Sequence, residues 1–349
     1  MLFVSRSTKI ISLMLGVIAL SILILNLQVY SFMNKPINIE SESVSFEIAN
    51  GSSFNFISNQ LIKKNIINND LWLKMYVRFF SLAGQIQAGD YLIEAHSTPK
   101  SILQQFISGR VKLYSFTLIE GWNARESLNA LQANKAVKAT ISEDEWPNFL
   151  KSLGSKRLHP EGLFLPETYN FSRNTSDREI LRLAYKLMKS TLEAEWATRT
   201  VNTHIKNEYE ALILASIVEK ETARSDERAK IAGVFLNRLE KRMRLQTDPT
   251  VIYGMGTTFD GNLTRINLKT DTPYNTYTRL GLPPTPISMP GKAAIRAVLQ
   301  PNLSEYLYFV ATGIEDGSHT FSKNKKEHDI AVLEYLSRIN KKKKFRKIN

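Results

Sequence analysis

The pattern of apolar and polar positions divides the chain into an apolar leader and a long amphipathic remainder. Residues 10–33 contain no charged side chain and are dominated by Ile, Leu, Val, Met, Phe and Ala. At about 1.5 Å per residue, such a helix can cross the roughly 30 Å hydrocarbon core of a bilayer. Tyr30 and Phe32 lie near its end, where aromatic side chains meet the membrane interface. The pattern predicts a cytoplasmic tail over 1–9 and a transmembrane helix over 10–33.

The flanks of this helix indicate its orientation and its fate. Arg6 and Lys9 precede the apolar run and Lys35 follows it, so a slight excess of positive charge favours an N-terminus in the cytoplasm. A cleaved signal peptide is the alternative, but its apolar region is normally shorter and no A-x-A-like site ends this run. We therefore expect an uncleaved single-pass anchor in the plasma (inner) membrane, with the remaining domains in the periplasmic or extracytoplasmic space.

A polar linker over 34–42 leads to a small module predicted over 43–110. Alternation of polarity indicates strands, and apolar residues at helical spacing indicate helices. Thr98-Pro99 and Gly109 are start and stop signals for a further helix. Two strands around a helix pair give a βααβ subdomain. The expected elements are strands over 45–48 and 91–93 and helices over 54–62, 71–80 and 98–109.

The pattern over 111–340 predicts a larger mixed α+β domain, followed by a basic tail over 341–349. Three of its helices show the capping-box signal, in which Asn or Ser is followed three residues later by Glu. These three helices begin at Asn123, Ser142 and Ser176. The other expected elements are strands over 112–119 and 306–311 and helices beginning at 207, 225, 292 and 326. The fold class is α+β.

The centre of this domain carries the strongest contrast in pattern. The helix from Asn207 is apolar on nearly every side between Ala211 and Val218, so we expect it to be buried. The segment from Gln246 to Gly291 is rich in Gly, Pro, Thr and Tyr, and we interpret it as a long ordered loop. Long loops inside compact domains are usually functional.

Composition excludes several functions. The chain has no cysteine, which excludes thiol nucleophiles and Cys-ligated zinc. Six of its net +13 charges lie in the tail from Lys341 to Lys347, and no zinc-finger or RNA-binding motif accompanies them, so we expect no nucleic-acid partner. His319 and His328 lack nearby acids at ligand spacing, so no metal is expected. No P-loop or dinucleotide motif indicates a cofactor.

Glu219 is the candidate catalytic acid. It lies where the buried helix gives way to polar chain, and its helical neighbours include Leu212 and Ala215. Partial desolvation there raises the pKa of a carboxyl, as a general acid requires. Glu221 is about 200° further around the helix, so we expect it on the solvated side beside Lys220 or Arg224. A structural salt bridge is the alternative role for Glu219.

The loop-rich segment offers the side chains typical of a carbohydrate site. Aromatic rings stack on sugar faces, while amides and hydroxyls bond sugar hydroxyls. Asp248 is the obvious second carboxylate, although it could equally serve as a turn or helix cap before Pro249. Our candidate substrate-binding residues are Gln246, Thr247, Asp248, Tyr253, Tyr274, Asn275 and Tyr277 from this segment and Glu161 from an earlier loop.

With these residues in view, the chain resembles the endolytic murein transglycosylase family, also called YceG-like. The resemblance extends over essentially the whole chain, and the loop over 161–169 also resembles the family, although Leu163 and Leu165 stand where aromatic residues are common. The words that carry the resemblance are Ala-Ser-Ile-Val-Glu219-Lys-Glu221-Thr222, Asn237-Arg238-Leu239, Met243-Arg-Leu-Gln-Thr-Asp-Pro-Thr-Val-Ile-Tyr-Gly254, Tyr274-Asn-Thr-Tyr277, Gly281-Leu-Pro-Pro284, Tyr306-Leu-Tyr-Phe-Val-Ala311 and His319-Thr-Phe321.

The resemblance implies a LysM-like subdomain on the βααβ module and a catalytic domain after it. It implies that Glu219 is the catalytic residue of a lytic cleavage of peptidoglycan glycan strands. In that reaction Glu219 protonates the oxygen between MurNAc and GlcNAc, and the MurNAc C6 hydroxyl closes on C1 as a 1,6-anhydro ring. The family further implies action on nascent strands, which ends their elongation, and association with peptidoglycan synthases.

Two other functions stay open from the sequence. The chain could be a two-carboxylate muramidase in which Asp248 activates water or acts as the nucleophile. It could also be a non-catalytic scaffold that binds the cell wall through the LysM-like subdomain. The mass of the products separates the first of these from a lytic enzyme, because an anhydro end is one water lighter than a reducing end.

Overall fold

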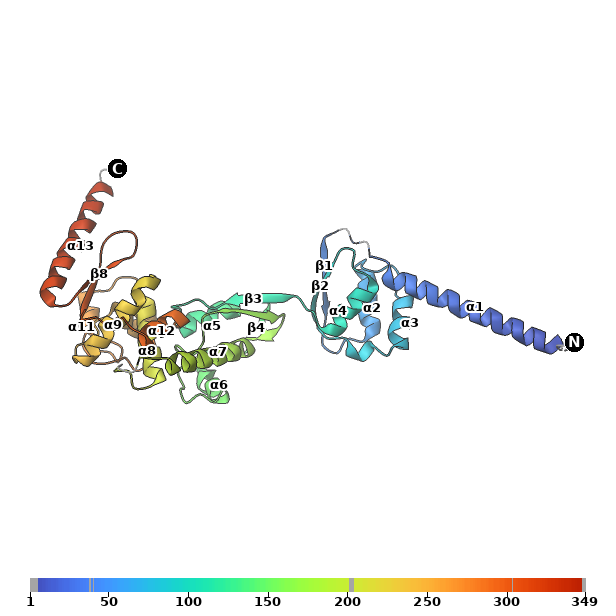
Figure 1. Ribbon diagram of the computed structural model, residues 1–349, viewed down its shortest axis with the longest axis horizontal. Helices are drawn as coiled ribbons and strands as arrows, with labels where there is room; N and C mark the ends of the chain where they lie inside the picture. The colour runs from blue at the N-terminus through green and yellow to red at the C-terminus, as the bar shows by residue number, and fades with distance from the viewer. Residues whose placement is uncertain (1–5, 38, 40, 201–203, 303, 347–349) are drawn as a thin grey trace. The chain divides into compact units, whose positions relative to one another are not determined.

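A computed structural model describes residues 6–37, 39, 41–200, 204–302 and 304–346 (Figure 1). The chain divides into two compact units. The first contains residues 1–114 with 171–173, and the second contains residues 115–170 and 174–349. Parts of the expected cytoplasmic and basic tails, 1–5 and 347–349, lie outside the described residues.

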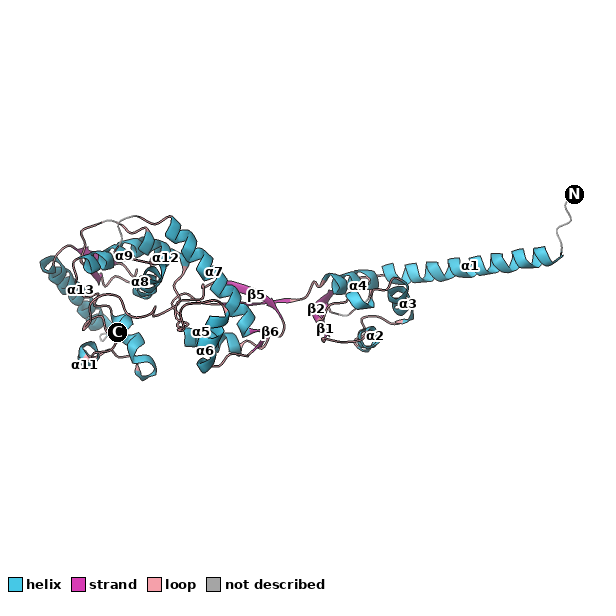
Figure 2. Cartoon of the chain, turned by 90° about the horizontal axis from the view of Figure 1, so that it is seen from below, coloured by secondary structure: helices cyan, strands magenta, loops and turns pink. Residues whose placement is uncertain are grey.

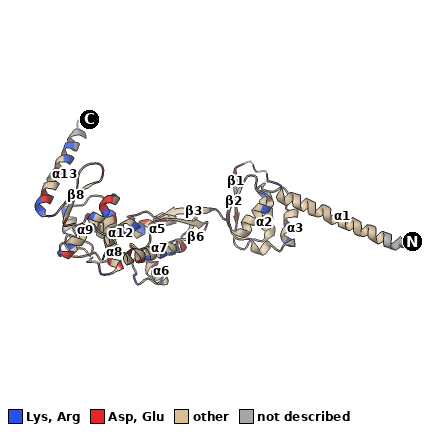
Figure 3. Cartoon of the chain, in the orientation of Figure 1, with Lys and Arg blue, Asp and Glu red and all other residues tan. Residues whose placement is uncertain are grey.

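The first unit begins with the helix α1, Arg6–Asn34. Over Ile10–Asn34 this helix is long and apolar enough to cross a membrane by length and composition (Figure 3). Its last turns do not end in solvent, because Met33 is only 1% exposed and lies in the core of the following module. Val29 and Phe32 pack against the same core. The apolar helix and the module therefore share one hydrophobic cluster.

The small module has the predicted βααβ order. Its two strands pair antiparallel with Phe46 opposite Tyr91, and the rings of Phe46 and Phe106 stack 5.6 Å apart in the core. Thr98 forms a capping box at the start of the last helix, and Gly109 ends it with a left-handed φ of 64°. The elements are β1, Ser43–Ile48; α2, Phe54–Lys63; α3, Leu71–Phe79; η1, Ala83–Gln85; β2, Gly89–Glu94; and α4, Pro99–Ser108.

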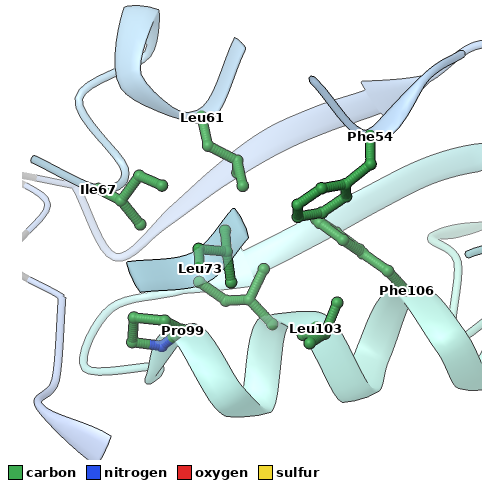
Figure 4. Close-up of a pocket in the computed structure, with 8 residues that line it drawn as sticks. Phe54, Leu61, Ile67, Leu73, Pro99, Leu103 and Phe106 are labelled. Atoms are coloured by element: carbon green, nitrogen blue, oxygen red, sulfur yellow. The ribbon is translucent and has the colours of Figure 1, made fainter. Parts of the chain in front are cut away.

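The core of this module contains a small gap between its helices (Figure 4). Its volume is about 10 Å³, and the eight residues that line it, including Phe54, Leu73 and Phe106, are all apolar. A water molecule needs at least this much space and also polar partners. The gap is therefore an imperfection of core packing and offers nothing to a sugar.

The second unit is mainly helical, with short strand pairs at its edges (Figure 2). In the described residues, β4 pairs in parallel with β6 and β7 pairs antiparallel with β8. β3 pairs with β5, and the ends of these two strands, 113–114 and 171–172, belong to the first unit. The strands are β3, Leu113–Thr117; β4, Val137–Lys138; β5, Thr168–Ser172; β6, Thr175–Ser176; β7, Tyr308–Ala311; and β8, His319–Ser322. The helices are α5, Ala124–Ala133; η2, Glu143–Glu145; α6, Trp146–Ser152; α7, Asp177–Ala197; α8, Glu208–Glu221; α9, Ser225–Glu240; α10, Asp248–Met255; η3, Gly256–Thr258; α11, Arg265–Lys269; α12, Lys292–Leu299; and α13, Lys325–Arg346.

The core of the second unit is built around α8. Ala211 through Val218 are all buried, as the apolar pattern predicts, and α8 packs against α9 and α12. The capping boxes predicted at Asn123, Ser142 and Ser176 are present. A mixed α+β class and a buried α8 are thus confirmed.

Two expectations for this unit were wrong in detail. The segment from 246 to 291 is not one long loop, because Asp248 starts α10 with Pro249 in the first turn, where proline costs no helical hydrogen bond. Tyr253 therefore stands on a helix. The last helix is also longer than its expected end at Ile339, since α13 continues through Arg346.

Candidate active site

Glu219 lies in the last turn of α8, and a neighbouring segment is held along that turn. Ser216 anchors the segment, because its hydroxyl accepts a hydrogen bond from the Ile287 amide at 2.9 Å and its carbonyl accepts one from the Ser288 hydroxyl at 3.1 Å. The segment then reaches Gly291, whose amide donates to Glu219 Oε2 at 2.9 Å. One buried serine thus brings a backbone donor to the candidate acid.

The second oxygen of Glu219 faces a cation. Arg228 Nη2, from α9, lies 3.2 Å from Glu219 Oε1 and 3.7 Å from Glu120 Oε2. The side chain of Glu219 is 5% exposed, that of Arg228 13% and that of Glu120 46%. The site therefore holds two carboxylates on one guanidinium, with Glu219 as the buried member and Glu120 as the solvent-facing one.

Two glycines allow this close arrangement. Gly121 has a left-handed φ of 80°, and its carbonyl accepts a hydrogen bond from Lys220 Nζ at 3.2 Å. Gly291 leaves room for its neighbour, because a Cβ there would stand 1.7 Å from Glu120 Oε1. The Gly121 amide also donates to the Met289 carbonyl at 2.9 Å, which joins the two glycine segments. Their backbones enclose the acid.

Burial has the largest effect on Glu219 and raises the pKa of its carboxyl above the ordinary value. The hydrogen bond from Gly291 lowers this pKa, the negative charge of Glu120 raises it, and the charge of Arg228 lowers it. The net direction is upward. A carboxyl so placed can stay protonated closer to neutral pH than a solvated glutamate, as a general acid must.

An open groove of about 770 Å³ begins beside this cluster. Glu120 and Arg228 are part of its wall, so the groove reaches the groups that contact Glu219. The rest of the wall comes from the loop over 165–167, from α7 and α9, and from Lys292 and Arg296 on α12. The volume is that of a ligand site, and the wall combines charged and polar side chains with apolar surface from Leu165, Pro166 and three alanines. Such a wall can take a sugar chain, which has apolar faces as well as hydroxyl groups.

The structure brings one set of predicted residues together on the other side of α8's end. The Thr247 hydroxyl donates to Glu221, and the Tyr277 hydroxyl donates to Asp248 Oδ1 at 2.6 Å. The Gln246 amide donates to the Thr276 carbonyl at 3.2 Å. Glu221 is thus not on the solvated side beside Lys220 or Arg224 as expected, because the segment from Gln246 covers that face of the helix.

Glu161, Tyr253 and Tyr274 form a second set. Glu161 is 2% exposed and accepts hydrogen bonds from the Tyr253 hydroxyl at 2.9 Å and from the Ala124 amide at 3.1 Å. The rings of Tyr253 and Tyr274 meet edge to face, 4.8 Å between centroids. Burial raises the pKa of Glu161 to about 7. The Ala124 amide lies in the first turn of α5, so a buried carboxyl caps that helix.

Asn275 is completely buried and is used within its own loop. Its side-chain amide donates to the carbonyls of Asn267, Leu268 and Thr270, and its oxygen accepts from the Tyr277 amide at 2.8 Å. Every hydrogen-bonding direction of this side chain is directed at the protein. The Asn275 side chain therefore holds its own loop in place.

The immediate partners of Glu219 were not among the predicted site residues. Glu120 lies in a loop, Arg228 on α9 and Gly291 at the start of α12. The three residues are therefore far apart in sequence. The signal available in the sequence was weak: Glu120-Gly121 follows a predicted strand, and Pro290-Gly291 precedes a predicted helix. Neither dipeptide by itself indicates a catalytic role.

The histidines do not form a metal site. His319 Nδ1 lies 2.7 Å from Glu227 Oε2, and its backbone amide donates to the same carboxylate at 3.0 Å. His328 stacks on the ring of Tyr308. Across the part of the chain that the structure describes, no group of three or more His, Cys, Asp and Glu side chains is arranged to hold a metal ion.

Fold and site together define a mixed α+β protein in which a buried glutamate with a raised pKa lies beside a groove with charged residues in its wall. The chain belongs to the YceG-like family, whose sequence profile matches residues 46–334. This membership confirms the resemblance on which the assignment of Glu219 depends.

The named relatives have one activity in common. The chain is 33% identical to an endolytic murein transglycosylase from Bacillus subtilis over 88% of this chain and 89% of that protein. It is 27% identical to one from Streptococcus pneumoniae, covering 86% of this chain and 60% of that longer protein. A 2.6 Å crystal structure of a yceG-like protein from Listeria monocytogenes superposes with a TM-score of 0.54 at 30% identity, over 82% of this chain and 98% of that one.

Proposed function

We propose that this chain is an endolytic murein transglycosylase, a lyase that cuts peptidoglycan glycan strands with Glu219 as its acid and base. The observation that carries the proposal is the environment of Glu219, which is buried, has a raised pKa and contacts Arg228, a residue in the wall of the groove. Membership of the YceG-like family and the names of the relatives support it.

In the first step protonated Glu219 gives its proton to the oxygen between MurNAc and GlcNAc. The bond from that oxygen to MurNAc C1 breaks, and positive charge develops on C1 and the ring oxygen. The GlcNAc fragment leaves with a hydroxyl. Proton transfer from a positioned acid contributes about 10²–10⁴-fold to such a reaction.

In the second step ionised Glu219 takes the proton of the MurNAc C6 hydroxyl, whose oxygen bonds to C1 and closes a 1,6-anhydro ring. Glu219 ends the cycle protonated, and no water is consumed. Between the steps its negative charge is stabilised by the Gly291 amide and by Arg228, both already in place. The two donors also fix the carboxylate, and each oxygen keeps a free lone pair for the proton.

The remaining residues take supporting roles in this proposal. The sugar-binding candidates Gln246, Thr247, Asp248, Tyr253, Tyr274, Tyr277 and Glu161 would shape or line the glycan path near α10. Asn275 would act through the loop that it anchors, since its amide is engaged there. The LysM-like identity of the βααβ module and its binding of glycan are part of the proposal, as is docking to peptidoglycan synthases.

The location follows from the first unit. We infer a single-pass anchor in the plasma membrane, with the N-terminus in the cytoplasm and the enzyme outside it. A cleaved signal peptide would remove Met33 from the module core, where it is 1% exposed. Loss of a buried Met costs about 2–5 kcal/mol of stability. Retention of α1 is thus favoured by packing as well as by sequence.

A hydrolytic muramidase is the second candidate, and one observation favours a particular form of it. Glu120 shares Arg228 with Glu219 and faces the groove, so it is placed as a second carboxylate. Asp248, the earlier candidate for that role, is bonded to Tyr277 on the Glu221 side of α8. Hydrolysis through Glu120 would leave a reducing MurNAc end.

Digestion of purified sacculi, followed by mass analysis of the fragments, tests the proposal. Wild type should yield 1,6-anhydroMurNAc ends, and Glu219→Gln should lose about 10³-fold or more in rate, since the amide cannot give a proton. Reducing-end fragments from wild type would replace the lyase with the hydrolase, and Glu120→Gln would then abolish cutting.

Glu240→Gln is the matched control, because Glu240 is an exposed glutamate on α9 that lies 3.7 Å from His204 Nε2 and away from the Glu219 cluster. It should cut like wild type. Wild-type activity in Glu219→Gln would refute the catalytic assignment. Strand binding without any cutting by wild type would leave the non-catalytic scaffold as the function.

A further inference from the structure

The helix α3 of the first unit is apolar on two opposite sides. Leu73 and Val77 point into the module core and are 3% and 1% exposed. Leu71, Met75 and Phe79 recur every four residues on another side and are 52%, 37% and 82% exposed. A stripe of large apolar side chains that faces away from the core normally packs against protein or lipid. The outer stripe therefore has no occupant within the described chain.

The position of α3 identifies the occupant. It packs against α1, as α4 also does, and both views draw α3 beside the end of α1 (Figures 1 and 2). A helical run of about 20 residues crosses the hydrocarbon core, so a span that begins at Ile10 ends near Val29. Val29 is itself packed against the module core. The module thus begins where the bilayer ends.

We propose that the outer face of α3, formed by Leu71, Met75, Phe79 and the adjacent Phe80, lies in the lipid interface of the membrane that α1 crosses. The inference rests on the proposed anchor and is independent of the enzymatic proposal. Aromatic and aliphatic side chains on a short helix are the usual components of an interfacial contact. Phe80 is 52% exposed and its ring meets that of Phe79 edge to face, so the two rings form one surface.

The polar groups of α3 fit the same location. Lys74 and Arg78 flank the apolar stripe, and Arg78 is exposed. Basic side chains beside an apolar face suit phospholipid head groups, because their stems lie along the apolar surface and their charges reach the phosphates. Lys74 is also paired with Asp70, so Arg78 is the freer of the two cations.

The consequence is a fixed base for the enzyme. A module held by α1 alone could tilt about the last turn of the anchor, whereas a second contact through α3 would hold it on the membrane surface.

Single-cysteine labelling of the full chain in lipid nanodiscs tests this inference, and the absence of native cysteine makes each label unique. An environment-sensitive dye is placed at Phe79→Cys and, in a separate variant, at Met75→Cys. The reference is Glu47→Cys, exposed on β1, which both views draw on the side of the module away from α1 (Figures 1 and 2). Leu20→Cys, within α1, reports whether the anchor itself spans the bilayer.

Labels at 79 and 75 should be quenched by a nitroxide lipid and should show an iodide quenching constant at least about threefold below that at 47. Equal iodide access at 79 and 47 would overturn the inference. Protection from iodide without quenching by the lipid would also overturn it, since another part of the protein would then cover α3. A solvent-exposed label at Leu20 would reject the anchor itself, which the sacculus assay with Glu219→Gln does not measure.

Discussion

Glu219 and Glu120 lie against the same guanidinium nitrogen of Arg228, at 3.2 Å and 3.7 Å. Each neighbour acts on the pKa of Glu219, and in opposite directions: the charge of Glu120 raises it and that of Arg228 lowers it. Since the proposed acid works only while protonated, activity is lost as pH rises through this pKa. Burial and the Gly291 hydrogen bond have the larger effects on this pKa, and Glu120 and Arg228 then move the alkaline limb in opposite directions.

Glu120→Gln and Arg228→Met should shift the alkaline limb of the pH–rate profile in opposite directions. Removal of the Glu120 charge lowers the pKa of Glu219, so the limb moves to lower pH. Removal of the Arg228 charge raises that pKa, so the limb moves to higher pH. Initial rates on sacculi between pH 4 and 9 give both limbs, with the exposed Glu240→Gln as control. Shifts of the same sign in both variants would contradict the arrangement.

Gly291→Ala tests how closely the backbone at Gly291 approaches the Glu120 side chain. The added methyl group would meet the carboxylate of Glu120, which is the flexible end of a side chain and can move away. The backbone φ of Gly291 is −76°, ordinary for alanine, so the fold should be kept. Displacement of Glu120 should then move the alkaline limb to lower pH, as in Glu120→Gln.

The double variant Gly291→Ala with Glu120→Ala supplies the control. It removes the carboxylate with which the methyl group collides, so Gly291→Ala should add no further shift to that of Glu120→Ala. The thermal unfolding midpoint of the double variant should differ from that of wild type only by the small amount that a surface substitution usually causes. An additive shift would show that Gly291 acts by a route other than Glu120.

Local chemistry made much of this fold predictable. The capping boxes at Asn123, Ser142 and Ser176 need only residues three positions apart, and all three are present. The burial of α8 could also be predicted from local sequence, because eight consecutive apolar or small residues leave no polar face.

The site was less predictable because its parts are distant in sequence. Gly291 and Glu219 are separated by 72 residues, and no pattern near either one indicates the other. The helix α10 was missed for a different reason. Proline and glycine usually mark loops, but Pro249 stands in the first turn, and Gly254 leaves room for Thr272, whose hydroxyl lies 3.0 Å from where a Cβ would stand.

Asn275→Ala should lower the free energy of unfolding. The change deletes an amide that satisfies three backbone carbonyls and orients Tyr277, so buried polar groups lose their partners. The expected loss is about 3 kcal/mol in the free energy of unfolding. Urea unfolding followed by tryptophan fluorescence measures it. A variant with unchanged stability and a raised KM would instead support direct contact with glycan.

Met33→Asp tests the junction of the anchor and the module. Met33 is buried in the cluster that α1 shares with the module, and an unpaired charge there is strongly unfavourable. The first unit should become sensitive to protease in membranes, whereas Asn50→Asp, at an exposed turn position of the same unit, should leave it resistant. Intact mass of the wild-type membrane protein should include residues 1–33. A product that begins after residue 33 would contradict an uncleaved anchor.

Glu161 makes the stability of the second unit depend on pH. Its pKa rises from the ordinary 4.5 to about 7 because of burial, so the folded state holds a proton that the unfolded chain has released. Its contribution is full below the lower value and is lost as pH rises to the higher one, about 3 kcal/mol in all. Glu161→Gln cannot ionise, so its urea midpoint should fall less than that of wild type between pH 5 and 8. Glu240→Gln should keep the wild-type slope, and equal slopes in Glu161→Gln and wild type would refute the buried proton.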